Sequence, residues 1–462
     1  MSIAKKKEFK RRDLTEGPIV RTLLLYMIPI LLSNLFQQLY NTVDSIVVGR
    51  FSGDYALAAV GSSGALINLM IGFFLGAATG SGVIFAMNFG AKDYAELRKT
   101  MDNAIILGLM IGVLISVLGV AFSDNLLTLM NTPDTVFPLA KQYLQIYLGG
   151  SIANILYNLG AALIRAEGNS RAPLVYLLIG GLTNIALDFL LVGAFHMGVV
   201  GAALATVASQ LIPAVLCLIH MGKMDKRYRL NLLKMKFDRG KCLELIRVSV
   251  PCGLQSAMFN ISNFLIQVKI NSFGDVVMAG VAAYGKIDGF IYMPTGALSL
   301  SLSTFVGQNI GAGHYERVQK GIRSVLLIAC ANAMFLGAVI FMTCPYLLRI
   351  FTKEEATIAA ALEMMHFLAP FSWTFTPTDI LGSAIRGAGK PFGVTVISAL
   401  SICVFRLIWL PVVLHFYHDV RLVYIVYPIS WIISTTAIFI FYRKKRAQYF
   451  SPRLVTFQDN VI

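Results

Sequence analysis

The chain has 462 residues, of which 56% are hydrophobic and only 14% charged, and its formal net charge is +15. Soluble proteins carry about 25% charged residues, and the mean hydropathy of +0.70 is far from a soluble composition. These values exclude a soluble protein and indicate a polytopic membrane protein, with no soluble domain of useful size between its spans.

The N-terminus combines a basic start, "KKKEFKRR", with an apolar run from Leu23, which resembles a signal peptide at first sight. The run continues through Asn34, Gln37 and Asn41, and no small-residue cleavage site follows a short apolar core. We therefore expect this segment to be retained as the first transmembrane helix.

Twelve segments reach the roughly 20 apolar residues that a membrane span needs. Their approximate bounds are 22–48, 56–86, 101–122, 138–164, 173–194, 200–221, 245–272, 279–305, 322–344, 358–384, 392–414 and 421–442. The runs are too long for barrel strands, and lipid offers no partner for backbone groups. The sequence therefore predicts an all-α integral membrane protein with twelve transmembrane helices.

Most of the 39 lysines and arginines lie in segments that twelve spans place on one side of the membrane. These segments are the N-terminal arm, the stretch 223–241, the tail after Tyr442, and the loops that follow spans 2, 4, 8 and 10. The positive-inside rule then predicts that both termini face the cytoplasm. We expect the protein to lie in the plasma (inner) membrane of the cell. The positive charge is a topology signal, and nucleic-acid binding is not needed to explain it.

Three pairs of motifs recur at a constant offset of 221 residues. "SGDYALAAVG" at 52 matches "FGDVVMAGVA" at 273, "NFGAKDYAELRK" at 88 matches "NIGAGHYERVQK" at 309, and "LIRAEG" at 163 matches "AIRGAG" at 384. The repeat predicts two six-helix lobes of equal orientation, related by a pseudo-two-fold axis along the membrane normal with a cavity between them. The predicted boundaries are 1–222 for the first lobe, 223–243 for a basic cytoplasmic linker, 244–443 for the second lobe and 444–462 for the tail.

A charge in the middle of the bilayer costs about 2.5–3.5 kcal/mol on insertion scales, so each one needs a reason. Asp44 in the first span, Asp188 in the fifth and Thr206 in the sixth lie roughly 9–15 Å below the outer surface, at about 1.5 Å per residue. Asn184 lies one helical turn from Asp188. Oxygen ligands suit a hard cation, and a proton could replace the metal where two carboxylates repel each other.

This cluster predicts a site for Na⁺ or H⁺ coupled to movement, and the alternative is a pair of structural, hydrogen-bonded acids near the interface. The repeat favours the functional interpretation. An offset of 221 places Trp409 opposite Asp188 and Phe405 opposite Asn184, so the acids belong to one half only. An acid that the shared fold requires would be expected in both halves.

Other polar residues of the first half give weaker signals. Gln37 and Tyr40 precede Asp44 by one to two turns, and Asn154 and Asn158 share a face of the fourth span. They would line a cavity in the first half, although hydrogen bonds between helices explain them equally well. Pro29 is expected to kink the first helix.

In the second half, Arg406 falls in the middle of the eleventh span and must find an anion or water. Asp379 and Asp288 are its candidate partners, and a structural ion pair is the expected arrangement; a functional part for these three residues is left open. The six cysteines form no CxxC or Cys/His metal pattern, so we expect buried small side chains without disulfides. No cofactor is expected besides the coupling ion.

Three stretches resemble the multidrug and toxic compound extrusion (MATE) family, and the resemblance covers about residues 15–445. They are "GPIVRTLLLYMIPILLSNLFQQLYNTVDSIVVGRFSG" near the start, "VGQNIGAG" at 306–313 and "NIALDFLLV" at 184–192. The resemblance implies two lobes that open alternately to the two sides of the membrane. It also implies export of amphipathic, often cationic compounds against an inward flow of sodium ions or protons.

The resemblance further implies roles for single residues. It assigns cation coupling to Asp44, Asn184, Asp188, Thr206 and the backbone carbonyl of Ala202, and it places Gln37 and Tyr40 near the substrate cavity. The stretch "GLQSAMFNISN" lacks the acid of the branch that uses a glutamate in helix 7. The chain therefore looks most similar to the prokaryotic DNA-damage-inducible-type branch, in which cation binding would relax the first helix at Pro29 and release substrate.

Other classes of protein fit less well. A flippase for lipid-linked precursors, from the same superfamily, would carry extra helices or a strongly cationic central cavity. An integral-membrane enzyme needs a nucleophile or metal cluster, and no HExxH or GxSxG motif occurs; a channel needs a filter-like loop. We expect a monomeric transporter, not an enzyme, whose partners are a small-molecule substrate and the lipid bilayer, with no nucleic acid.

Overall fold

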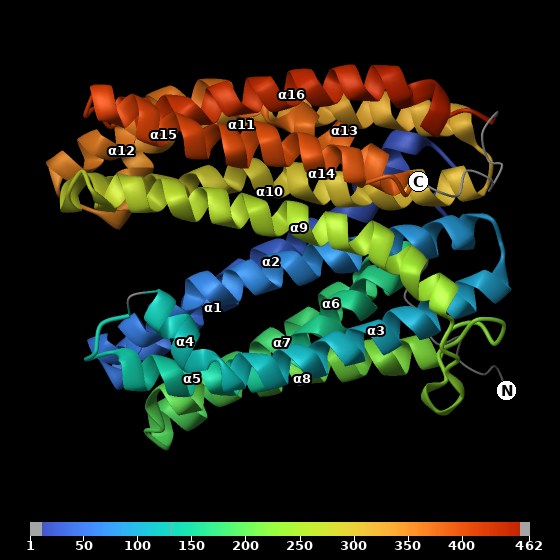
Figure 1. The fold of residues 1–462 in the computed structure, drawn as a ribbon, viewed down its shortest axis with the longest axis horizontal. Coiled ribbons are helices and arrows are strands. Elements are labelled where there is room, and N and C mark those ends of the chain that lie inside the picture. Colours follow the sequence, from blue (N-terminus) through green and yellow to red (C-terminus); the bar gives the residue numbers. More distant parts are fainter. Residues whose placement is uncertain (1–11, 131, 453–462) are drawn as a thin grey trace, which may run out of the picture. The chain divides into compact units, whose positions relative to one another are not determined.

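The computed structural model describes residues 12–130 and 132–452, and all regular structure in these residues is helical (Figure 1). The first half contains α1 (Ile19–Ser52), α2 (Asp54–Gly90), α3 (Tyr94–Ala121), α4 (Ser123–Leu129), α5 (Phe137–Gly149), α6 (Ser151–Ala166), α7 (Arg171–Asp188), the π turn η1 (Phe189–Ala194) and α8 (Gly198–Gly222). The short 3-10 turn η2 (Leu232–Lys234) follows. The second half contains α9 (Arg239–Asn271), α10 (Asp275–Gly311), α11 (Tyr315–Phe351), α12 (Glu355–Leu368), η3 (Ala369–Thr374), α13 (Thr376–Gly387), α14 (Phe392–Ser398), the π turn η4 (Ala399–Val404), α15 (Phe405–Phe416) and α16 (Arg421–Tyr449).

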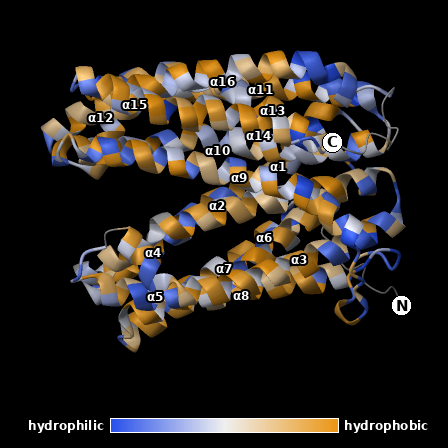
Figure 2. Ribbon diagram, in the orientation of Figure 1, coloured by the Kyte–Doolittle hydropathy of each residue, from blue (hydrophilic) through white to orange (hydrophobic). Residues whose placement is uncertain are grey.

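All twelve predicted spans coincide with helices, and the predicted all-α membrane fold is confirmed. Within the described residues, nine helices are long and apolar enough to cross a membrane, and α5–α6 makes a tenth span if this pair, bent by 46°, is counted as one. The other two spans are α9, which carries the polar residues Gln255, Asn260 and Asn263, and the α12–α13 segment, which η3 interrupts. Figure 2 shows apolar residues along the helices and hydrophilic residues gathered towards helix ends and loops.

Packing divides the chain into two compact units. Most of the first unit is Ile28–Gly253, whereas Leu14–Met27 and the chain from Leu254 onwards belong to the second unit. Two helices therefore pass from one unit into the other, α1 beside Pro29 and α9 beside Pro251. The boundaries predicted at 222, 243 and 443 stay predictions, because the packing division falls inside these two helices.

The repeat extends to the backbone conformation. Helices α2 and α10 are each 37 residues long and begin 221 residues apart. The residue before each is a glycine with a positive φ, 83° at Gly53 and 98° at Gly274. The two units thus begin their second long helix at equivalent positions and with the same turn, as an internal repeat of 221 residues predicts.

One position of the repeat carries strain in the first unit only. Lys92 has a φ of 56°, whereas its counterpart in the repeat, Gly313, has a φ of 76°. A side chain in this left-handed region costs about 1–2 kcal/mol. We expect Lys92→Gly to raise the free energy of unfolding by about 1 kcal/mol, because glycine recovers this strain but gives back part of it as chain entropy. Thermal unfolding in detergent measures the change; Gly313→Ala, the matched control, should lower stability, and a destabilised Lys92→Gly would contradict the argument.

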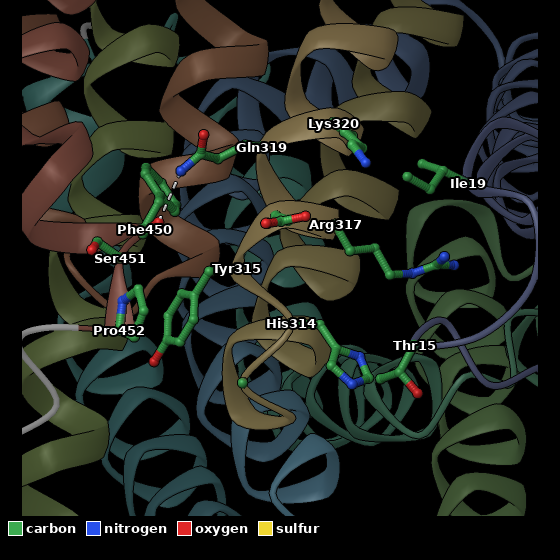
Figure 3. A pocket seen from close by; sticks show the side chains of 12 residues that line it. Thr15, Ile19, His314, Tyr315, Arg317, Gln319, Lys320, Phe450, Ser451 and Pro452 are labelled. Carbon is green, nitrogen blue, oxygen red and sulfur yellow. Dashed lines mark hydrogen bonds between the residues drawn. The ribbon is translucent and has the colours of Figure 1, made fainter.

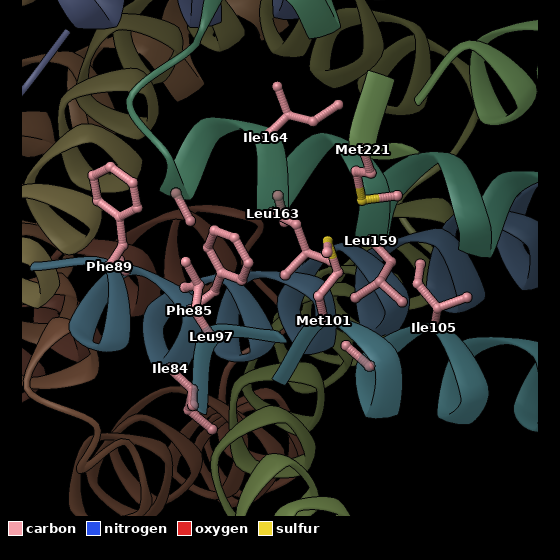
Figure 4. Packing of buried hydrophobic residues seen from close by; sticks show 14 of the residues in the cluster. Ile84, Phe85, Phe89, Leu97, Met101, Ile105, Leu159, Leu163, Ile164 and Met221 are labelled. Carbon is pink, nitrogen blue, oxygen red and sulfur yellow. The ribbon is translucent and has the colours of Figure 1, made fainter. Parts of the chain in front are cut away.

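An apolar core joins α2, α3, α6 and α8 within the first unit. Figure 4 shows Phe85, Met101 and Leu163 converging in this core, and each of them is fully buried. A glycine permits the close approach of α3 and α6: a Cβ atom on Gly108 would come within 2.9 Å of Leu159 Cδ2. Small residues at helix contacts of this kind are typical of membrane proteins, where close backbone packing stabilises the fold.

The segment predicted as a basic linker packs tightly onto the first unit. Tyr228 is buried and donates a 2.6 Å hydrogen bond to Glu167, which is itself buried. The Tyr228 ring stacks on the ring of Tyr94, the first residue of α3, at a centroid distance of 5.9 Å. The guanidinium of the neighbouring Arg227 lies 3.8 Å from the centre of the same Tyr94 ring. Lys241, at the start of α9, forms an ion pair of 2.7 Å with Glu96 of α3 and one of 2.6 Å with Glu244 of its own helix. This stretch therefore acts as part of the first unit's framework.

Tyr228→Phe tests this packing with the loss of one oxygen atom. A hydrogen bond to a charged group contributes about 1.5–3 kcal/mol, and its loss leaves the Glu167 carboxyl buried without that donor. We expect the free energy of unfolding to fall by about 2 kcal/mol. Thermal unfolding of the purified protein measures it, with Tyr55→Phe as an exposed control. An unchanged stability would show that the hydrogen bond from Tyr228 to Glu167 does not contribute to the stability of this packing.

Candidate cation-coupling site

Two helices of the first unit supply the predicted acids. Asp44 lies on α1 and is half-buried, whereas Asn184 and Asp188 lie one turn apart near the end of α7 with exposures of 1% and 0%. Asp188 is the last residue of α7, and the π turn η1 follows it at once. Such π turns inside helices occur frequently at functional sites, because the extra residue redirects the backbone.

The carboxyl groups of Asp44 and Asp188 lie within hydrogen-bonding reach of each other. Asp44 Oδ1, both oxygens of Asp188 and both polar atoms of the Asn184 amide are buried, and within the described residues none of them has a hydrogen-bond partner. Each buried polar group left in this way costs about 1–3 kcal/mol. The site therefore offers several oxygen atoms for a proton or a cation that the chain itself does not supply.

Thr206 and Ala202 belong to α8, and the Thr206 hydroxyl donates to the Ala202 carbonyl at 2.9 Å. This bond to the preceding turn is a common use of threonine in helices, so it does not by itself mark a ligand site. The link to the acids is Tyr143 of α5, whose hydroxyl lies within reach of Thr206 and close to both Asp44 and Asp188. Tyr143 thus links Thr206 to the two acids, and Asn184 lies one turn before Asp188 on α7.

Sequence reasoning missed Tyr143. It is buried and its ring stacks on Tyr147, one turn later, at 6.3 Å. Both tyrosines belong to an apolar cluster with Val47 and Val48 of α1 and Ala202 of α8. The spacing of two tyrosines four residues apart was the available signal, but an aromatic pair on one helix face is common in any apolar core.

The residues predicted to line a substrate cavity lie in the same unit. Gln37 and Tyr40 are half-buried on α1 and within hydrogen-bonding reach of each other, and Tyr40 also lies close to Asp44. On α6, the Asn158 amide donates to the backbone and side-chain oxygens of Asn154 at 2.9 Å and 3.0 Å. The asparagines thus satisfy each other, as the alternative interpretation expected, and their part in a cavity stays a prediction.

The first helix continues through Pro29 over its full 34 residues. The carbonyl of Pro29 accepts a 2.8 Å hydrogen bond from the Ser33 hydroxyl. The predicted kink stays a prediction, but Pro29 stands next to the point where α1 passes from the second unit into the first. A residue that removes a backbone hydrogen bond at this point favours bending there.

The ion pair predicted for Arg406 in the second unit is wrong. Asp379 pairs with Arg386 at 3.3 Å instead, and Asp288 accepts a 3.1 Å hydrogen bond from Tyr284. Arg406 is buried, and its nearest polar partner is the Ser430 hydroxyl at 3.0 Å. Residue types alone could not show which face of each helix meets its neighbour.

An open pocket of about 670 Å³ lies elsewhere in the second unit, at the turn between α10 and α11 (Figure 3). His314, Arg317 and Lys320 line it together with residues at the start of α1 and just after α16. Gln319 donates a 3.1 Å hydrogen bond to the Phe450 carbonyl there. None of the predicted site residues lines this pocket.

Comparisons with known proteins agree with both halves of the repeat. The sequence model of the MatE family matches residues 29–190 and 251–412, which include Asp44, Asp188 and Arg406. The chain is 28% identical over 399 residues to "Probable multidrug resistance protein YpnP" of Bacillus subtilis, covering 86% of this chain and 89% of that protein. It is 26% identical over 406 residues to "Probable multidrug resistance protein NorM" of Thermotoga maritima, covering 85% of each.

A solved structure described as "Outward-facing conformation of a multidrug resistance MATE family transporter of the MOP superfamily" has the same fold. It matches with a TM-score of 0.87 at 21% identity, and the match covers 95% of this chain and 99% of that chain. At this identity the likeness concerns the fold alone.

Proposed function

Because the chain belongs to the MatE family of multidrug and toxic compound extrusion transporters, we propose that it exports amphipathic small molecules in exchange for Na⁺ or H⁺ through the Asp44–Asp188 site. The observation that carries the proposal is the contact between two carboxyl groups that have no hydrogen-bond donor among the described residues. The family is one of transporters, which agrees with the expectation that this chain is not an enzyme.

A cation at this site would act through simple electrostatics. Two unit negative charges about 4 Å apart repel by about 4 kcal/mol at an effective dielectric constant near 20. A free energy of this size shifts a two-state equilibrium by roughly a thousandfold. Cation binding therefore favours an arrangement with the carboxyl groups together, and cation release favours one with Asp44 moved away.

Helix α1 is the element that such a change would move. It supplies Asp44 to the site, and its beginning packs in the second unit while the remainder packs in the first. Asn184, Asp188 and Thr206 come from the adjoining helices α7 and α8, which pack extensively against each other. We infer that α7 and α8 form the fixed part of the site and α1 the movable part.

Transport in liposomes tests the proposal. Purified protein is reconstituted, a fluorescent amphipathic cation such as ethidium is placed on the side from which it would be exported, and a sodium gradient and a pH gradient are applied separately. We expect one of the two gradients to drive ethidium uphill, and its collapse by the matching ionophore to stop the movement. Uphill movement under neither gradient, or equal movement without any gradient, would contradict coupled export.

The membrane location follows from the helices and the family, whereas three finer points remain predictions. These are the plasma membrane as the site of action, the cytoplasmic position of both termini and the monomeric state. Labelling of single cysteines placed in the tail after Tyr442 in intact cells would determine the side of the C-terminus.

A further inference from the structure

Arg406 is a charged residue in the interior of the second unit that has no counterion among the described residues. Arg406 is 3% exposed, and within 4 Å of its guanidinium the described residues hold no carboxylate. Its bonds are to neutral groups: Nε donates to Ser430 at 3.0 Å, and Nη1 reaches Ser262 and Asn263 at 3.5 Å and 3.4 Å. A buried charge with only neutral and partly long contacts is expensive to maintain, and charges inside membrane spans mark functional sites by default.

The acids nearest in the fold are engaged elsewhere. Asp379 is held by Arg386 and by the Ser299 hydroxyl at 2.9 Å. Asp288 accepts the hydroxyl of Tyr284. The guanidinium therefore keeps its positive charge available for an anion that is not part of the described chain.

A hydrogen-bond donor without a partner accompanies this charge. The hydroxyl of Tyr292, on α10, is buried and makes no hydrogen bond within the described part of the chain. It lies within electrostatic range of both Asp288 and Arg406. A neutral phenol donates readily to an oxygen anion. The Tyr292 ring is joined to Arg406 through Trp431 and Tyr427, whose ring lies beside the guanidinium.

Aromatic rings surround the two donors. The Arg406 guanidinium lies 4.6 Å from the centre of the Tyr427 ring, and Trp431 contacts Tyr427, Tyr292 and Phe375 at centroid distances of 5.9–6.3 Å. Tyr292 and Phe375 also meet edge to face at 6.1 Å. Tyr292, Phe375 and Tyr427 are only partly buried, and partly open aromatic rings near a fixed charge suit a ligand with an aromatic body and one acidic group.

The local backbone repeats a feature of the first unit. In each unit, a π turn adjoins the charged residue inside the membrane: η1 begins directly after Asp188, and η4 ends two residues before Arg406. The two turns occupy different positions in the 221-residue repeat, so they are not explained by a shared helix irregularity. Each unit thus places a π turn beside a charge, negative in the first and positive in the second.

We propose that Arg406 and Tyr292 bind the acidic group of an aromatic amphipathic compound, a carboxylate, sulfonate or phosphate, whose rings pack in the aromatic cluster of Tyr292, Phe375, Tyr427 and Trp431. Its place as a transported substrate rests on the proposed function, but binding itself does not. Arg406 contributes the charge and its remaining N–H donors, and Tyr292 contributes a further hydrogen bond.

Matched ligands that differ only in charge test the site. Calorimetric titration of the full-length protein in detergent at pH 7 compares naphthalene-2-sulfonate with naphthalene-2-sulfonamide, and anthracene-9-carboxylate with anthracene-9-carboxamide. We expect each acid to bind at least about tenfold more tightly than its amide, a factor of the size expected for one hydrogen bond to a charged group. If neither pair shows a preference for the acid, the proposal is wrong.

Variants assign the preference to the two residues. Arg406→Gln should remove the preference for the acids, and Tyr292→Phe should reduce it about threefold without loss of folding, because its hydroxyl has no partner in the protein. Arg421→Gln is the control, since Arg421 is an exposed arginine paired with Glu363 at 2.6 Å. A preference that survives both Arg406→Gln and Tyr292→Phe would overturn the proposal; should Arg406→Gln not fold, Tyr292→Phe decides alone.

Two further experiments distinguish a lipid ligand from an aromatic acid, and a failure of the proposed function from a failure of the Arg406 site. Short-chain phosphatidylglycerol tests a lipid headgroup, and tighter, Arg406-dependent binding of this lipid than of the aromatic acids would overturn the assignment to an aromatic compound. The Asp188→Asn variant should keep the preference for acids while it loses cation-driven export. If no gradient drives export by the unsubstituted protein but acids still bind preferentially, only the proposed function is contradicted. If export is coupled but the preference for acids is absent, only the Arg406 proposal is contradicted.

Discussion

Asp188→Asn is expected to abolish gradient-driven export and at the same time to make the protein more stable. The asparagine amide removes one of two adjacent charges and can donate to the Asp44 carboxylate, so a repulsive contact becomes a hydrogen bond. Relief of one buried unsatisfied group contributes about 1–3 kcal/mol to the free energy of unfolding. Uphill transport in liposomes and thermal unfolding in detergent measure the two effects on the same preparation.

Asp124→Asn is the matched control for this variant. Asp124 is an acid of the same unit, but it is exposed and pairs with Lys141 at 2.7 Å. Exposed pairs contribute little, so export and stability should both stay close to those of the unsubstituted protein. Full gradient-driven export by Asp188→Asn would show that the acids are structural. A less stable Asp188→Asn would show that a hydrogen-bond donor already satisfies the Asp188 carboxylate.

The composition of the candidate site could be predicted because membrane interiors make acids rare. Asp44 and Asp188 stand out against apolar helices, and estimates of depth from helix rise alone placed Asn184 and Thr206 beside them. Tyr143 could not be found this way, since a tyrosine in an apolar helix carries no such cost. The error at Arg406 has the same origin: its depth is readable from sequence, but the helix face on which Asp379 lies depends on packing.

The helices themselves follow closely from hydropathy and the repeat. The predicted span 279–305 lies inside α10, Asp275–Gly311, and the difference arises because helices continue into polar ends that a hydropathy window excludes. The bend at Gly149–Gly150 and the turns η1 and η4 were not predicted, because tertiary packing decides where a helix departs from regular hydrogen bonding. The packing of the stretch 223–243 on the first unit was also not predicted, since its basic composition is typical of a solvated loop.

Gly80→Ala is expected to lower the free energy of unfolding by about 3 kcal/mol, because α2 and α9 cross there with their backbones in contact. A Cβ atom on Gly80 would lie 2.6 Å from the Cα atom of Ser249 and 2.9 Å from its nitrogen. Backbone atoms of a helix cannot move aside as the end of a flexible side chain can. Overpacking of this kind therefore costs about 1–3 kcal/mol or more. The adjoining Ser81 and Ser249 hydroxyls, 3.0 Å apart, would lose their hydrogen bond as well.

Gly61→Ala on the same helix is the control, since a Cβ atom at Gly61 meets nothing within 4 Å. Alanine there should raise stability by about 0.5–1 kcal/mol through helix propensity alone. Thermal unfolding of both variants in the same detergent measures the difference, which should reach about 4 kcal/mol. Because Ser249 lies in the part of α9 that belongs to the first unit, just before Pro251, this crossing anchors α9 on one side of the point where it changes units. Equal stability of the two variants would mean that α9 is free to shift along α2, and the crossing would then be a sliding contact and not an anchor.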